Sequence, residues 1–125
     1  MTKASAFRAV DFAESGWREI NSGNVSTSTL TTVTSADAFS VIAVDLTTTY
    51  LVRIPNNNFP RGFQTVITRL GTGALKIDGQ PSANIVLRAA PGIGTTPSLA
   101  ARNSVASIIY SGSPTTGWLV FGDLI

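Results

Sequence analysis

Apolar and polar residues alternate along several short runs of this chain, as they do in β-strands that bury one face. The central stretch, 62–78, has two such runs on either side of Gly71-Thr72-Gly73. Glycine accepts the positive φ that a tight hairpin loop needs, so this stretch predicts a β-hairpin in the middle of a sheet. Further strand-like runs cover 30–34, 39–44, 50–54, 84–88, 104–110 and 118–121.

Turn-forming residues separate these runs. Proline, glycine and asparagine gather in 55–62, 79–82, 91–97 and 111–117, and no run of ten residues has a helical pattern. Short strands at regular spacing predict an all-β fold, a single antiparallel β-sandwich or barrel-like domain over 26–125 that ends in a hairpin. The expected core includes Val66, Ile77, Ile109, Tyr110 and Trp118.

Residues 1–25 differ from the rest, because large apolar residues are scattered there among charges of both signs. We expect an extended N-terminal arm, whose apolar side chains are candidate contacts with another protein or subunit. An arm folded back on its own domain is the alternative. No apolar segment follows Lys3, so no secretory signal is expected. The candidate contact residues are Phe7, Phe12, Trp17 and Ile20.

Composition narrows the chemistry. At 125 residues the chain is the size of one domain, and it has no cysteine and no histidine, which excludes disulfides and the commonest transition-metal ligands. A net charge of +2 is too small to indicate nucleic-acid binding, and no apolar run reaches the ~20 residues of a membrane span. Only 13% of the residues are charged, which favours contact with other protein. We expect no cofactor.

The carboxylates suggest no catalytic pair. Asp37, Asp45, Asp78 and Asp123 each lie next to a predicted turn, where aspartate commonly bonds to local backbone. The three asparagines at 56–58 have no neighbouring carboxylate for a calcium site. A serine or threonine nucleophile would have no histidine as its base. We therefore expect no enzymatic activity.

The aromatic residues near the C-terminus allow two interpretations. Trp118 and Tyr110 could form a stacking platform for a sugar, which would make the protein a glycan binder. Large aromatic residues in a terminal hairpin more often close one end of a core, and we favour that interpretation.

From about Leu30 to Leu124, three-quarters of the chain, the sequence resembles a β module of tailed-bacteriophage structural proteins. The most specific part is the terminal W-x-x-x-G-D-L, and the other matching segments carry structural residues rather than a site. These segments are 34–37, Ile54-Pro55, 62–66, 69–73, Ile77, 104–110 and 118–124.

The resemblance implies a virion component, made in the host cytoplasm and assembled as a homotrimer. Because the chain consists of an arm and one module, we expect a capsid decoration (cement) protein that binds the major capsid protein at the head surface. The alternative is a short tail or head fibre that binds the host cell surface, and an enzyme ranks third. Neither nucleic acid nor membrane is expected as a partner.

Overall fold

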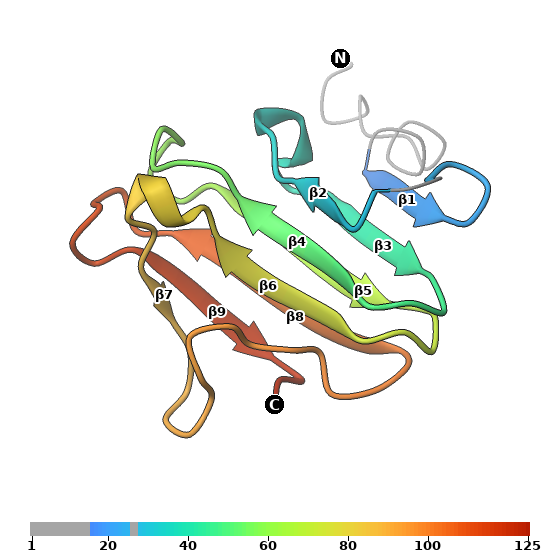
Figure 1. The fold of residues 1–125 in the computed structure, drawn as a ribbon. Coiled ribbons are helices and arrows are strands. Elements are labelled where there is room, and N and C mark those ends of the chain that lie inside the picture. The colour runs from blue at the N-terminus through green and yellow to red at the C-terminus, as the bar shows by residue number, and fades with distance from the viewer. Residues whose placement is uncertain (1–15, 26–27) are drawn as a thin grey trace, which may run out of the picture.

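The computed structural model describes residues 16–25 and 28–125, and these residues form nine β-strands in two sheets (Figure 1). The large sheet has the order β1-β3-β5-β8-β9-β7, and the small sheet has the order β2-β4-β6. The prediction of an all-β fold is confirmed. The strands are β1 (Trp17–Asn21), β2 (Leu30–Thr32), β3 (Val41–Asp45), β4 (Tyr50–Ile54), β5 (Gln64–Arg69), β6 (Leu75–Gly79), β7 (Leu87–Arg88), β8 (Ser104–Tyr110) and β9 (Trp118–Gly122).

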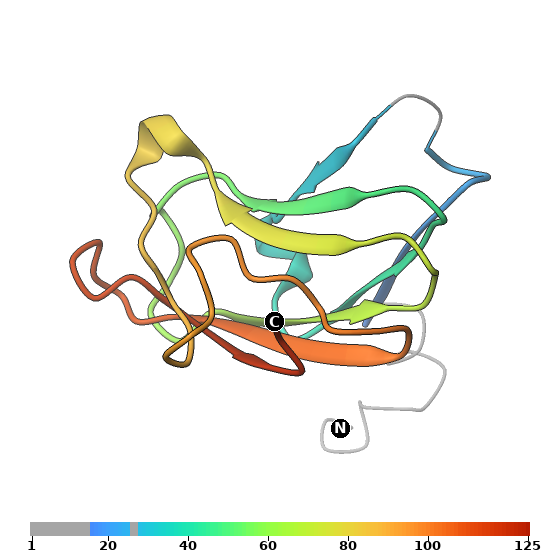
Figure 2. The same ribbon diagram turned by 60° about the horizontal axis from the view of Figure 1, so that its bottom comes forward.

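The first six strands alternate between the two sheets, so the chain winds three times around the core. We call each winding a coil, and each coil has one strand in the large sheet and the next strand in the small sheet. β1, β3 and β5 are parallel neighbours in the large sheet, and β2, β4 and β6 are parallel neighbours in the small one. Val41 pairs with Val66 and Tyr50 pairs with Leu75, in each case 25 residues later. The sheets face one another, with the core between them (Figure 2).

The prediction of an antiparallel sandwich or barrel is therefore wrong in its connectivity for residues 17–79. The expected hairpin at 62–78 does not form, because β5 and β6 lie in different sheets and each pairs with the coil before it. Antiparallel pairing is found where β8 joins β5 and β9, so the predicted C-terminal hairpin is confirmed. Alternation of apolar and polar residues predicts a strand, but it does not show whether the neighbouring strand is parallel or antiparallel.

Gly71 and Gly73 form a corner between the sheets rather than a hairpin loop. Neither glycine has a positive φ. A Cβ atom on Gly71 would overlap the backbone of Leu46, and one on Gly73 would overlap the backbone of Thr48. The Gly73 N–H donates to the Leu46 carbonyl at 2.9 Å. Glycine is needed here because the corners of successive coils touch.

The core lies between the inward faces of the two sheets. Ile77, Tyr110 and Trp118 are buried there, as predicted. Val66 and Ile109 are only partly buried, and their assignment to the core is wrong. In β5 the inward positions are Thr65 and Ile67, both fully buried.

The buried polar residue explains the error for β5. The Thr65 hydroxyl donates to the Ser40 carbonyl at 3.0 Å, which satisfies a polar group inside the core. With a threonine facing inward, the apolar pattern of the strand does not show which face is buried.

Four aromatic rings close one end of the core. The Trp118 ring centroid lies 4.7 Å from that of Tyr110 and 5.2 Å from that of Phe59, and Phe63 completes the group. The indole N–H of Trp118 donates to Oδ1 of Asn57 at 3.3 Å. Trp118 is 0% exposed, so the core interpretation is confirmed and the ring presents no face to a sugar.

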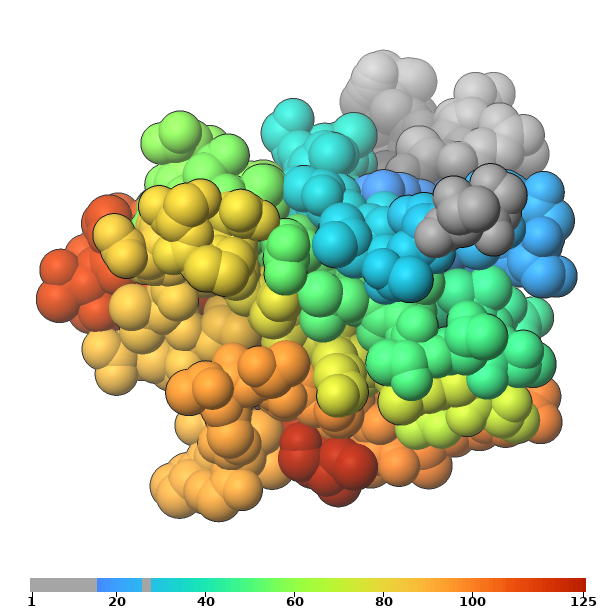
Figure 3. Space-filling model, viewed as in Figure 1, coloured from blue at the N-terminus to red at the C-terminus, as the bar shows by residue number. Residues whose placement is uncertain are grey.

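The edge of the small sheet at β6 is covered by the segment 97–99. Ile77 donates its N–H to the Pro97 carbonyl, and Leu99 donates its N–H to the Leu75 carbonyl, each at 2.9 Å. Leu99 is itself buried. In the view onto the small sheet, the covering segment (orange) lies beside β6 (Figure 3).

The predicted arm does not extend to residue 25. Residues 17–21 form β1, which pairs with β3 along its whole length, and Ile20 is buried in the core. Residues 1–15 lie outside the described residues, so the arm remains a prediction for that segment. None of the helical segments in the described residues has the length and hydrophobicity of a membrane-spanning helix.

Replacing Gly71 with alanine is expected to destabilise the fold by about 1–3 kcal/mol, because the new methyl group meets backbone that the register holds in place. The matched control is Gly94→Ala, which has open space and no positive φ, and which should leave stability unchanged within about 0.5 kcal/mol. Urea denaturation measures both. Equal stability of the two variants would contradict the stacked corners.

Trp118→Ala is expected to reduce stability by about 3–5 kcal/mol, because the ring is fully buried among other aromatic rings. The neighbouring Leu119 points outward, and Leu119→Ala should lose less than about 1 kcal/mol. Denaturant unfolding followed by tryptophan-independent circular dichroism compares them. A small loss for Trp118→Ala would disprove the assigned orientation of β9.

Candidate interaction surfaces

The outer face of the small sheet is charged. Arg53 and Asp78 lie opposite one another on β4 and β6, and two hydrogen bonds of 2.8 and 3.0 Å join the guanidinium to the carboxylate. The hydrogen bonds that the guanidinium donates to Asp78 raise the pKa of Arg53 above its ordinary value. Lys76 is exposed on the same face. A face of this kind is compatible with water.

The outer face of the large sheet differs sharply. On β3, β5, β8 and β9 the outward positions alternate with core residues. Among the outward residues of these four strands, only Asp45, at the end of β3, is charged. We call this surface the uncharged face. Its outward positions are Val41, Ala43, Gln64, Val66, Thr68, Val105, Ser107, Ile109, Leu119 and Phe121, of which Ala43 and Thr68 are themselves buried.

Large apolar groups are exposed on and around this face. Trp17 of the neighbouring β1 is 47% exposed, Phe121 is 50% exposed and Phe39 is 75% exposed. With about 150–250 Å² per aromatic side chain, these three alone leave roughly 300 Å² of aromatic surface in solvent. Apolar patches of this size on single subunits often mark interaction sites.

Phe39 has an unusual conformation. Its φ is +56°, in the left-handed region that bulky residues rarely occupy. The Phe39 N–H donates to the Gln64 carbonyl at 2.7 Å, which holds the residue against β5. Beside it lies a hollow of about 260 Å³, lined by Gly16, Phe39, Ser40, Val41, Gln64, Thr65 and Val66.

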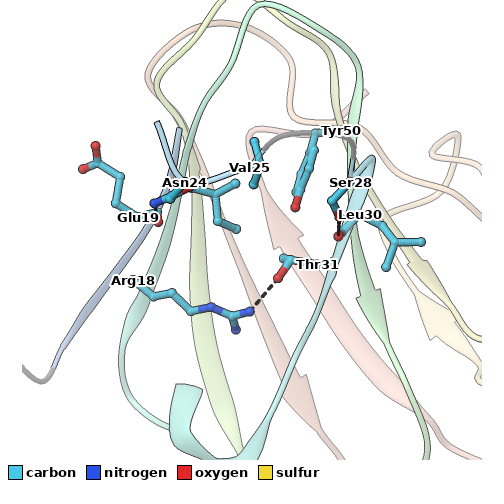
Figure 4. A pocket seen from close by; sticks show the side chains of 9 residues that line it. Arg18, Glu19, Asn24, Val25, Ser28, Leu30, Thr31 and Tyr50 are labelled. Carbon is cyan, nitrogen blue, oxygen red and sulfur yellow. Dashed lines mark hydrogen bonds between the residues drawn. The ribbon is translucent and has the colours of Figure 1, made fainter. Parts of the chain in front are cut away.

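A second hollow, of about 400 Å³, opens between β1 and β2, the first strands of the two sheets (Figure 4). The Arg18 guanidinium spans it, donating to Oγ1 of Thr31 at 2.5 Å and to Oδ2 of Asp37 at 2.8 Å. We interpret this hollow as the closed end of the coils rather than as a binding site.

Asp37 supports the chain just before Phe39. Its side chain is 3% exposed, and Oδ2 also accepts the Thr34 N–H at 2.8 Å. The Asp37 carbonyl accepts the Ser40 hydroxyl at 2.7 Å. The prediction that Asp37 is a turn residue is confirmed, and its ion pair with Arg18 fixes that turn between the two sheets.

The other predicted structural carboxylates have different partners. Asp123 accepts the Val105 N–H at 3.3 Å, and Asp45 is exposed at the end of β3. Asp78 is not a turn residue, because it lies within β6 and pairs with Arg53. Within 16–25 and 28–125, no three or more His, Cys, Asp or Glu residues are grouped to hold a metal ion.

The four predicted contact residues have different locations. Phe7 and Phe12 lie outside the described residues. Trp17 is exposed, and its indole N–H donates to Glu19 at 3.2 Å. Hydrogen bonds donated by the side chains of Asn21 and, to a smaller extent, Trp17 lower the pKa of the Glu19 carboxyl group below its ordinary value. Ile20 is buried inside its own domain, so its prediction as an outside contact is wrong.

Phe39, Val105, Leu119 and Phe121 were not predicted as surface residues, although the sequence contains a signal for three of them. The strand run 118–121 is apolar at every position, and 104–110 has apolar residues of both parities. A strand that is apolar on both faces indicates that both faces are buried. Within the described residues, no second sheet covers the outer face of these strands.

No protein-family model matches the chain, and no curated protein matches it.

Asp37→Ala is expected to reduce stability by about 1.5–3 kcal/mol, because it removes charged hydrogen bonds from Arg18 and from the Thr34 backbone. Asp45→Ala is the control and should have little effect, since Asp45 is exposed. Thermal and urea denaturation measure both. If the two aspartates behave alike, the proposed role of Asp37 at the first coil is wrong.

Proposed function

We propose that this protein is a non-enzymatic structural component of a tailed-bacteriophage virion, a homotrimeric capsid decoration protein that binds the major capsid protein and stabilises the head. The resemblance of residues 30–124 supports this choice. The observation that carries it is the contrast between a charged small-sheet face and the uncharged face of the large sheet.

A face without charges is suited to protein contact, because burying it does not require a charge to be desolvated. A water-compatible face on the opposite side is suited to the outside of an assembly. The described carboxylates that are buried or paired, Asp37 and Asp78, take part in structural ion pairs, so we propose no catalytic role for them.

The N-terminal segment is proposed to hold the protein on the capsid. The described chain begins at Gly16, which lines the hollow beside Phe39 and accepts the Val41 N–H at 2.8 Å. A segment that ends at Gly16 therefore joins the domain next to the uncharged face. Burying Phe7 or Phe12 against a capsid would contribute about 1.5–3 kcal/mol for each side chain.

Deletion of residues 1–15 is expected to leave a folded domain that no longer decorates heads. The deletion stops before Trp17, since removing β1 would also remove Ile20 from the core. Full-length and truncated proteins are mixed with undecorated capsids, and bound copies per head are counted. We expect at least a tenfold loss of occupancy, with circular dichroism unchanged.

The control is Lys76→Glu, which alters the charged face and should bind capsids as the full-length protein does. Equal occupancy of the full-length and truncated proteins would refute the role of the N-terminal segment. Binding of the full-length protein to host cells but not to capsids would favour the alternative, a short tail or head fibre.

A further inference from the structure

We propose that copies of this chain associate through the uncharged face, arranged head to tail, so that the β1 edge of one copy meets the β7 edge of the next. This inference rests on the proposed function, in which the protein is a self-associating subunit. It adds the surface, the direction of the contact and the residues that make it.

The charges at the rim of the large sheet indicate a second copy as the partner. Glu19 is exposed on the outward side of β1, at one edge of the sheet, and Arg88 is exposed on β7, at the other. Between the two edges, Asp45 is the only charged residue among the outward positions of the four central strands. Head-to-tail contact therefore brings Glu19 of one copy toward Arg88 of the next, a negative edge toward a positive one.

The direction of the contact has a consequence for symmetry. Two different edges that meet form a heterologous interface, which closes into a ring when the rotation between copies allows it. A ring of three copies, with the uncharged faces turned toward the axis, buries all of these faces together. The homotrimer of the proposed function has this symmetry.

The size of the face is adequate for such a contact. At strand spacings of about 4.8 Å and rises of about 3.3 Å per residue, the four strands of the uncharged face, each of about six residues, cover roughly 400 Å² before side-chain relief is counted. Standard interfaces bury about 800 Å² on each partner, which is the same order of area.

Phe39 is the expected anchor. It is 75% exposed and has a φ of +56°, a conformation that bulky residues adopt at a cost and that is concentrated at functional sites. The adjacent hollow of about 260 Å³ is lined by Val41 and Val66 and has room for an apolar side chain from a neighbouring copy. Exposed aromatic groups beside such hollows are typical interface anchors.

The test is sedimentation equilibrium of the purified full-length protein at 1–100 µM (an order-of-magnitude range around typical subunit affinities), without capsids. We expect an oligomer. Phe121→Glu places a charge within the uncharged face and should yield a monomer with an unchanged melting temperature. Phe39→Asn should raise the dissociation constant at least tenfold without lowering the melting temperature, because asparagine tolerates the left-handed conformation.

Ile125→Asn is the matched control. Ile125 is 66% exposed, but its backbone pairs with Ser98 beside the small sheet and it lies outside the uncharged face. Its replacement should leave the oligomer intact. Loss of the oligomer in this variant as well would overturn the assignment to the uncharged face.

The edges are tested separately. Glu19→Lys gives both edges the same sign and should weaken association at least threefold, with Glu19→Gln between it and the unaltered protein. An unchanged dissociation constant for Glu19→Lys overturns the head-to-tail arrangement.

Two further outcomes overturn the inference. One is a full-length protein that remains monomeric at 100 µM, with Phe121→Glu reducing capsid binding, since the uncharged face then meets the capsid protein. The other is an oligomer unaffected by Phe121→Glu. An oligomer that depends on Phe121 but does not bind capsids supports the inference and counts against the capsid function alone.

Discussion

The structure depends on the register between the second and third coils of the chain, which is the same in both sheets. β5 follows β3, and β6 follows β4, with the same offset of 25 residues. This offset places Ile67 beside Ile42 and Ile77 beside Val52, so the inward side chains form continuous rows in the core. A shift by one residue would turn every row to the opposite face. Gly71 and Gly73, at the corner between β5 and β6, allow the second and third coils to approach closely enough for this register.

The same register creates the outer surfaces. Val41 and Val66 are neighbours on the outward side of the large sheet for the same reason that Ile42 and Ile67 are neighbours inside it. The antiparallel pair β8 and β9 continues this arrangement, with Ser107 next to Phe121 outside and Ile108 next to Val120 inside. Among the described residues, the large sheet therefore has a core layer on one side and an uncharged, partly apolar layer on the other, and the small sheet covers only the first.

An ion pair in the first coil closes one end of the two-sheet structure and fixes the adjacent surface turn. Arg18 points between the sheets and pairs with Asp37, which also accepts the Thr34 backbone N–H. This single carboxylate closes the open end of the coils and fixes the turn that leads into Phe39. A structural ion pair and an exposed aromatic group thus depend on the same short segment.

The sequence by itself determined that the chain is all-β, and it located most strands within a few residues, because alternation and turn residues are local properties. It also identified Trp118, Tyr110 and Ile77 as core. Tertiary structure decided whether neighbouring strands run parallel, because pairing joins residues 25 positions apart and the local pattern is the same for both directions. It likewise decided that Thr65 faces inward and Val66 outward, because a hydrogen bond to Ser40 satisfies the buried hydroxyl. The runs 104–110 and 118–121 signal a second apolar face in the sequence, but the uncharged face as a whole exists only because four strands are brought side by side.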